Sequence, residues 1–250
     1  MGDEYDLKDE DLTPAPRRTA FGPTAGTPRQ PRQPQPLGYA KSTYQPTEPV
    51  STRGKVAVAF AGVLAALNLA LVGLEAWDIV ILNRLIDGTF VDGDDATYGV
   101  LALSTAGLYF LVAIGFMIPF FMWLYRAVSN VRIRTGDSQS GPGMSVGWWF
   151  IPIANLFMPY KVLADLWKRT FSDNSAGLVA IFWLGWIATS FVDRGVMRFY
   201  ADAVENGDWQ QAISINYASI GSSLVNAGLY VLLIVIVLRI SRGQDEPETV

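Results

Sequence analysis

The stretch VAVAFAGVLAALNLALVG, residues 56–73, carries no charged side chain and is the strongest indication of the fold class. A helix needs roughly 20 mainly apolar residues to cross the hydrocarbon core of a bilayer. The apolar character continues, less purely, beyond this stretch as far as Ile86. The sequence therefore predicts a transmembrane helix over about residues 56–82.

Three later stretches have the same character. Residues 98–125 and 213–238 are uncharged throughout. Residues 176–198 contain a shorter apolar core that ends before Asp193. We therefore expect an all-α integral membrane protein with four transmembrane helices, in a membrane domain of residues 55–240.

The composition excludes several functional classes. The 250 residues are 50% hydrophobic and 17% charged, against about 25% charged in an average soluble domain. There is no cysteine and no histidine, which excludes disulfides, cysteine nucleophiles, Ser-His-Asp triads and thiolate or imidazole metal sites. A net charge of −4 argues against nucleic-acid binding. We expect a non-catalytic protein whose partner is the lipid bilayer, with no cofactor and no metal.

The first fifty residues differ from the rest of the chain. Residues 1–50 hold nine of the 14 prolines and few aromatic residues, which predicts a disordered, proline-rich cytoplasmic tail. Residues 1–12 are acidic, whereas residues 13–47 carry five basic side chains and no acidic one. Two interpretations stay open: a solvated tether, or a docking tail whose residues 13–47 contact anionic lipid or a protein partner.

The segment of residues 146–170 is apolar but is interrupted by two prolines. Pro152 and Pro159 are seven residues apart, which disfavours an unbroken spanning helix. Residues 159–170 alternate apolar and charged side chains at helical spacing, as in a helix that lies at the membrane interface. We therefore expect a re-entrant or interfacial segment, followed by an interfacial helix.

The distribution of basic residues predicts the orientation. With four spans and a cytoplasmic N-terminus, ten Lys and Arg side chains flank the cytoplasmic ends of the spans and three flank the external ends. A full crossing by residues 146–167 would weaken this asymmetry, which follows the positive-inside rule. The sequence thus predicts a multi-pass protein of the plasma membrane with both termini cytoplasmic, and residues 241–250 as a short cytoplasmic tail. The ten side chains are Arg53, Lys55, Arg126, Arg132, Arg134, Lys161, Lys168, Arg169, Arg239 and Arg242.

Small residues recur at three- and four-residue steps in the first and last spans. Such stripes let membrane helices approach closely, within the bundle or between copies in a homo-oligomer. We also expect Asn68 and Asn226 to hydrogen-bond a neighbouring helix. The stripes are Ala59, Gly62, Ala66, Ala70 and Gly73, and Ser214, Ala218, Gly221 and Gly228.

Charged residues near the external ends of the spans allow two interpretations. Glu75 and Asp78 are three residues apart and share a helix face. Either they form an ion-pair cluster, such as Glu75 with Arg194 or Arg198, or all of these charges lie in water at the interface.

Two motifs stand out beside the predicted cytoplasmic end. They read WLYRAVSN at residues 123–130 and WFIPIANLFMPYKVLADLW at residues 149–167. The pattern W-x-x-R-x-x-x-N, followed by W-x-x-P-x-x-N-L-x-x-P and a later tryptophan, resembles the domain of unknown function 4328 family over about residues 55–240. The resemblance implies a multi-span bacterial membrane domain, mainly actinobacterial, with no established activity. The candidate site residues are Trp123, Arg126, Asn130, Trp149, Pro152, Asn155, Pro159 and Trp167.

These residues fit two physical roles. In the structural role, Asn155 satisfies carbonyls freed by the prolines or caps the next helix, Arg126 bonds the same loop, and the tryptophans anchor at the interface. In the binding role, Arg126, Asn130 and Asn155 form a polar pocket open to the cytosol, suited to a carboxylate or phosphate group such as a lipid headgroup.

Three functions follow from these features. The sequence favours a scaffold or sensor with a cytosolic recruiting tail. The alternative is a small-solute or lipid transporter or binding protein with a cytosol-facing polar pocket. A membrane enzyme acting through Lys161 and Asp165 ranks last, because such a pair is usually a surface ion pair.

Overall fold

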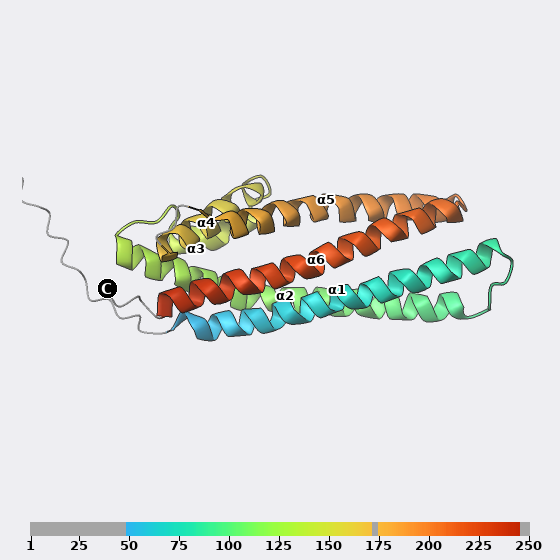
Figure 1. Ribbon diagram of the computed structural model, residues 1–250, viewed down its shortest axis with the longest axis horizontal. Helices are drawn as coiled ribbons and strands as arrows, with labels where there is room; N and C mark the ends of the chain where they lie inside the picture. The colour runs from blue at the N-terminus through green and yellow to red at the C-terminus, as the bar shows by residue number, and fades with distance from the viewer. Residues whose placement is uncertain (1–48, 172–174, 246–250) are drawn as a thin grey trace, which may run out of the picture. The chain divides into compact units, whose positions relative to one another are not determined.

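The computed structural model describes residues 49–171 and 175–245, and within them it contains four helices long and apolar enough to cross a membrane. These are α1 (Val50–Ile86), α2 (Asp94–Thr135), α5 (Gly177–Glu205) and α6 (Trp209–Asp245), shown in Figure 1. The predicted all-α fold with four membrane-capable helices is confirmed. The predicted tail lies outside the described residues up to residue 48, and Val50 already begins α1.

Short turns make consecutive long helices antiparallel. Gly88 and Gly93 flank the acidic turn between α1 and α2, and Gly207 lies in the turn between α5 and α6. All three have positive φ, between 68° and 98°, a conformation that glycine adopts without the steric cost of a Cβ. The glycines therefore end the helices where the sequence becomes polar.

The packing of the four long helices is uneven. The most extensive contact joins α1 to α6, and α1 also packs on α2, while α5 packs on α6. Figure 1 shows α6 between α5 and α1. In contrast, α2 and α5 make no extensive contact with each other within the described residues. A space bounded by α2, α5 and one face of α6 is therefore not closed by helix packing.

One end of the bundle joins the beginning of α1 to the end of α6. The backbone N–H groups of Val50 and Ser51 donate to the Asp245 carboxylate at 2.9 and 3.0 Å. We call this the basic end, because residues 49–57, 126–171 and 237–245 there carry the ten basic side chains noted above. The opposite, acidic end comprises residues 84–98 and 198–213.

The proline-containing segment is broken, as predicted. It consists of α3 (Pro142–Gly147), the 3₁₀-helices η1 (Trp148–Phe150) and η2 (Ala154–Leu156), and α4 (Met158–Phe171). Pro152 lies in the turn between η1 and η2, and Pro159 lies in the first turn of α4, where its missing N–H costs nothing.

The amphipathic pattern of α4 is also confirmed, but its apolar face has a different partner. Val162, Leu163 and Leu166 are buried in the same core as Leu124 of α2 and Ile236 of α6, and Trp167 lies with them. This face packs on protein, because the basic end presents an apolar surface between α2 and α6. Lys161 and Lys168 are exposed, as expected.

The predicted small-residue stripes do not pack within the chain. On α1 the stripe residues are exposed or half-buried, and a Cβ added to Gly62 or Gly73 would meet no atom within 4 Å. The four stripe residues of α6 are exposed as well. The buried face of α1 instead carries Gly54, Ala57 and Ala61, and a Cβ on Gly54 would lie 2.7 Å from Ser241 Oγ. The intrachain prediction was wrong because small residues occur on every face of α1, and contact between copies stays a prediction.

Candidate functional site

The first motif joins α2 to the end of α6. Trp123 is fully buried, and its indole N–H donates to Ser241 Oγ at 2.9 Å. Asn130 is also buried and donates to Gln244 Oε1 at 3.4 Å. Gln244 in turn donates to the Ala127 carbonyl at 3.2 Å. Because α6 continues to Asp245, the predicted C-terminal tail supplies two partners of the motif.

Two of the motif tryptophans are not the interfacial anchors that the sequence predicts. Trp123 and Trp167 are buried in the core of the basic end, and Trp167 packs on Phe171 with ring centroids 4.7 Å apart. The difference arises because α4 covers this end of α2, so that aromatic side chains between them are enclosed by protein.

The second motif packs against α2 and α5. The Trp149 ring lies 5.3 Å from Phe120 and 5.7 Å from Trp183, measured between centroids. Trp183 donates its indole N–H to the Leu156 carbonyl at 3.0 Å and so ties the broken segment to α5. Sequence reasoning missed Trp183, although the clustering of Phe182, Trp183 and Trp186 in one short apolar core was a usable signal.

Two polar atoms of the second motif are buried without a hydrogen-bond partner among the described residues. They are Nε1 of Trp149 and Oδ1 of Asn155. The backbone N–H of Asn155 donates to the Ile151 carbonyl at 2.7 Å, but the Oδ1 atom caps no described helix. The capping role expected for this oxygen is therefore not observed. Native proteins rarely leave such atoms unpaired, so both need an explanation.

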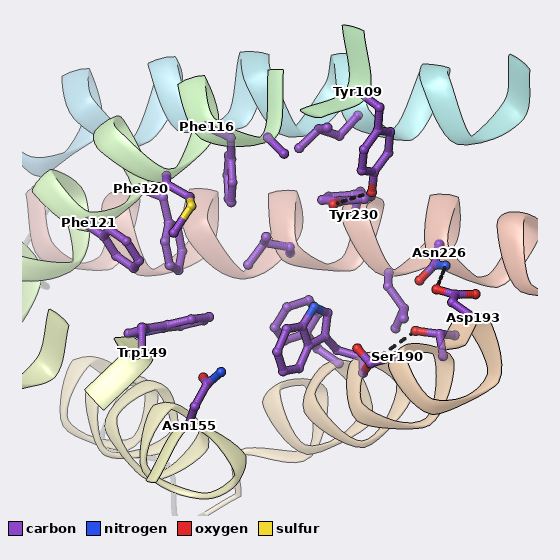
Figure 2. A pocket seen from close by; sticks show the side chains of 18 residues that line it. Tyr109, Phe116, Phe120, Phe121, Trp149, Asn155, Ser190, Asp193, Asn226 and Tyr230 are labelled. Atoms are coloured by element: carbon purple, nitrogen blue, oxygen red, sulfur yellow. Dashed lines mark hydrogen bonds between the residues drawn. The ribbon is translucent and has the colours of Figure 1, made fainter. Parts of the chain in front are cut away.

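Trp149 and Asn155 line a cavity of about 410 Å³, which lies between α2, α5 and α6 (Figure 2). Its volume is in the range of small-molecule sites, and most of its lining is apolar or aromatic. The other candidate residues do not line it: Trp123, Arg126, Asn130, Pro152, Pro159 and Trp167. The predicted pocket of Arg126, Asn130 and Asn155 is thus not a shared cavity lining, and Asn130 bonds Gln244 instead.

The opposite end of the cavity is polar. The Asp193 carboxylate accepts hydrogen bonds from Ser222 Oγ and, at 3.1 Å, from Asn226 Nδ2. The hydroxyls of Tyr109 and Tyr230 share a hydrogen bond of 2.9 Å beside this end (Figure 2). The expectation that Asn226 bonds a neighbouring helix is confirmed, whereas Asn68 donates to Leu64 of its own helix at 2.8 Å.

Asp193 is held at the level of the uncharged part of α6. Its partners Ser222 and Asn226 lie near the middle of residues 209–238, which contain no Lys, Arg, Asp or Glu. Arg194 donates to the Ser190 carbonyl at 2.8 Å and lies over the Phe191 ring. Within membrane-spanning segments, ionisable groups are costly and usually functional. From the sequence alone, Asp193 is interpreted only as the residue at which the apolar core of a span ends.

Two carboxylates of α1 accept hydrogen bonds from α6, between the level of Asp193 and the acidic end. Glu75 accepts from Ser219 Oγ and, at 3.1 Å, from Ser223 Oγ. Asp78 is buried and accepts from the Tyr200 hydroxyl and, at 2.7 Å, from Asn216.

The expected pairing of Glu75 with Arg194 or Arg198 is wrong, and Asp78 does not lie in water. Their observed partners are neutral donors, mostly from α6. The sequence signal was the spacing of polar residues along the uncharged part of that helix, which places them on one face. These residues are Asn216, Ser219, Ser222, Ser223 and Asn226.

The sequence model of a family described as a domain of unknown function, DUF4328, matches residues 83–242. The chain belongs to this family. The match includes both motifs and nearly the whole cavity lining, but it leaves out most of α1, so it is narrower than the resemblance over residues 55–240. No curated protein and no solved structure matches the chain. The family description carries no activity.

Proposed function

We propose that this protein binds a small, mainly apolar molecule in the cavity between α2, α5 and α6, as a transporter or carrier within the membrane. The observation that carries the proposal is the pair of buried, unpartnered atoms Trp149 Nε1 and Asn155 Oδ1 in the cavity lining. Each unmade hydrogen bond costs about 1–3 kcal/mol. Because protein encloses both atoms, a ligand that accepts from Trp149 and donates to Asn155 recovers this free energy when these side chains rotate toward the cavity.

The packing of the helices supports access from the bilayer. Because α2 and α5 make no extensive contact along their described lengths, we infer that a molecule dissolved in the hydrocarbon core enters the cavity between them. Broken helical segments beside a substrate site are common in membrane transporters. Here η1 and η2 supply that segment at the basic end of the cavity.

The sequence alone favours a scaffold or sensor over a transporter or binding protein, whereas the cavity favours the transporter or binding protein. A scaffold or sensor role depends on a recruiting tail at residues 1–50, of which residues 1–48 lie outside the described residues, and it stays a prediction. Capture of a protein or of anionic lipid by residues 13–47 also stays a prediction. For the enzymatic alternative, Asp165 accepts from Arg169 at 2.7 Å and from the Gln139 N–H at 3.2 Å, which supports a structural role for this carboxylate.

The test uses triphenylphosphine oxide, an apolar probe whose oxygen can accept a hydrogen bond from Trp149. The full chain would be reconstituted in nanodiscs, and binding would be followed through tryptophan fluorescence, because Trp149 and Trp186 line the cavity. We expect saturable binding that is lost in Ala113→Phe, which fills the cavity from α2.

Ala106→Phe is the matched control, since Ala106 is exposed on the same helix and is not part of the lining. Circular dichroism would establish that both variants keep the helical content of the parent chain. Saturable binding that is equal in both variants would place the probe elsewhere and overturn the proposal, as would an absence of saturable binding to the parent chain.

A further inference from the structure

We propose that the ligand carries a positive charge, which Asp193 binds; this inference rests on the proposed function of the cavity. The ligand class is an organic cation, such as a quaternary ammonium or phosphonium compound, with an aromatic or aliphatic body. Four features of the cavity support this: the charge of the lining, the partners of Asp193, the aromatic surroundings and the position of Asp193.

The first feature is the charge of the lining. Of the eighteen residues that line the cavity, Asp193 is the one that carries an acidic or basic side chain. No Lys or Arg is among these eighteen to attract a carboxylate or phosphate. The binding role suggested by the sequence, with Arg126 holding an anion, therefore does not fit this cavity. An anionic ligand would instead be repelled by Asp193 in a medium of low dielectric constant.

The second feature is the set of groups that hold Asp193. Ser222 donates a hydrogen bond to one carboxylate oxygen and Asn226 donates one to the other, and both donors are neutral. Among the described residues, Asp193 forms no ion pair within 4.0 Å, and its side chain is otherwise exposed. The two bonds fix the orientation of the carboxylate, but they do not balance its charge. A bound cation would do so at a depth where an isolated charge is unfavourable.

The third feature is aromatic. On α5, Trp186, Ser190 and Asp193 are spaced by four and three residues, so one helix face presents an indole ring and the carboxylate to the same cavity. Tyr109 and Tyr230 line the same cavity from α2 and α6. Aromatic faces attract organic cations, and they cannot replace the water shell of a small metal ion. The surroundings therefore favour a large, weakly hydrated cation.

The fourth feature is position. Figure 2 shows Asp193 and Asn226 at one end of the cavity and Trp149 and Asn155 at the other. The charged group is therefore placed on the side of the acidic end, and the two motif residues with buried, unpartnered atoms lie at the other end. A molecule with an apolar body between a cation and a neutral hydrogen-bonding group would satisfy both ends.

Three probes of similar size and aromatic character, but different charge, test the inference. They are tetraphenylphosphonium, tetraphenylborate and neutral triphenylphosphine oxide. With the full chain in nanodiscs, and empty nanodiscs as the partition background, we expect the phosphonium to bind about tenfold or more weakly to Asp193→Asn than to the parent chain. The oxide should bind both proteins equally. Asp202→Asn on the same helix is the control, because Asp202 is exposed at the acidic end.

The outcomes separate this inference from the proposed function. If the phosphonium binds the parent chain and Asp193→Asn equally, while Ala113→Phe abolishes binding of the oxide, the cavity is confirmed and the cation inference is overturned. Tetraphenylborate binding to the cavity as tightly as the phosphonium would also overturn it. If Ala113→Phe affects neither probe, the proposed function fails together with the inference.

Discussion

The basic end and the middle of the bundle both bury polar side chains, but they satisfy them differently. At the basic end, Asn130 donates to Gln244, Gln244 donates to the Ala127 carbonyl and Trp123 donates to Ser241, so that all of these donors and acceptors are neutral. In the middle, the charged groups Glu75, Asp78 and Asp193 accept from neutral donors. The basic end therefore holds helices together through neutral groups, whereas the three carboxylates of the middle form no ion pair within 4.0 Å among the described residues.

The largest effect is expected from breaking the basic end. Trp123→Ala removes a fully buried ring and the hydrogen bond to Ser241. We expect a loss of about 3–5 kcal/mol in the free energy of unfolding, measured by titration of detergent-solubilised protein with sodium dodecyl sulfate. Phe150→Ala is the control, since that ring is exposed, and its effect should be within about 0.5 kcal/mol. Equal stability of the two variants would show that the basic end is not the stabilising region.

A smaller effect is expected from neutralising the middle. Asp78→Asn keeps the shape of the side chain, and its amide oxygen can still accept from Tyr200 and Asn216. Burying a neutral amide costs less than burying a carboxylate, so the unfolding free energy should change by less than about 1 kcal/mol. The same titration measures it, beside Asp202→Asn. A loss above about 2 kcal/mol would mean that the charge itself holds α1 to α6.

The smallest effect on stability is expected from two single-cysteine substitutions, which report the side of the membrane on which each end lies. The chain has no cysteine, so Gln139→Cys at the basic end and Asp92→Cys at the acidic end each give one reactive thiol at an exposed position. With both termini in the cytoplasm of a plasma-membrane protein, an impermeant thiol reagent should label Asp92→Cys in intact cells. It should label Gln139→Cys only in inverted vesicles. The reverse pattern would contradict the proposed orientation.

The number of spans could be predicted because the length and hydropathy of a helix are local properties. The uncharged stretch of residues 56–73 was sufficient for α1. The break near Pro152 and Pro159 also follows from local chemistry, since proline lacks a backbone donor. The amphipathic face of α4 could be predicted for the same reason, although its protein partner could not.

The faces that pack could not be predicted, because lipid and protein surroundings select the same apolar residues. Ala61 is buried and Ala59 is exposed, yet nothing in their composition distinguishes them. Likewise, only part of the candidate site could be predicted from the sequence. The proline-flanked motif pointed to Trp149 and Asn155, whereas Asp193 follows a short apolar core and resembles the end of a span. Only the packing of α5 on α6 places it within the uncharged region.

The bond between the start of α1 and Asp245 has a consequence for protein engineering. Because the Val50 N–H lies 2.9 Å from this carboxylate, the two boundaries of the membrane domain are adjacent in space. A short polar linker could join them, and new termini could be opened in the acidic turn between Gly88 and Gly93. Such a circularly permuted chain would present its termini at the opposite face of the bilayer. It would also supply a scaffold for attaching reporters on that side.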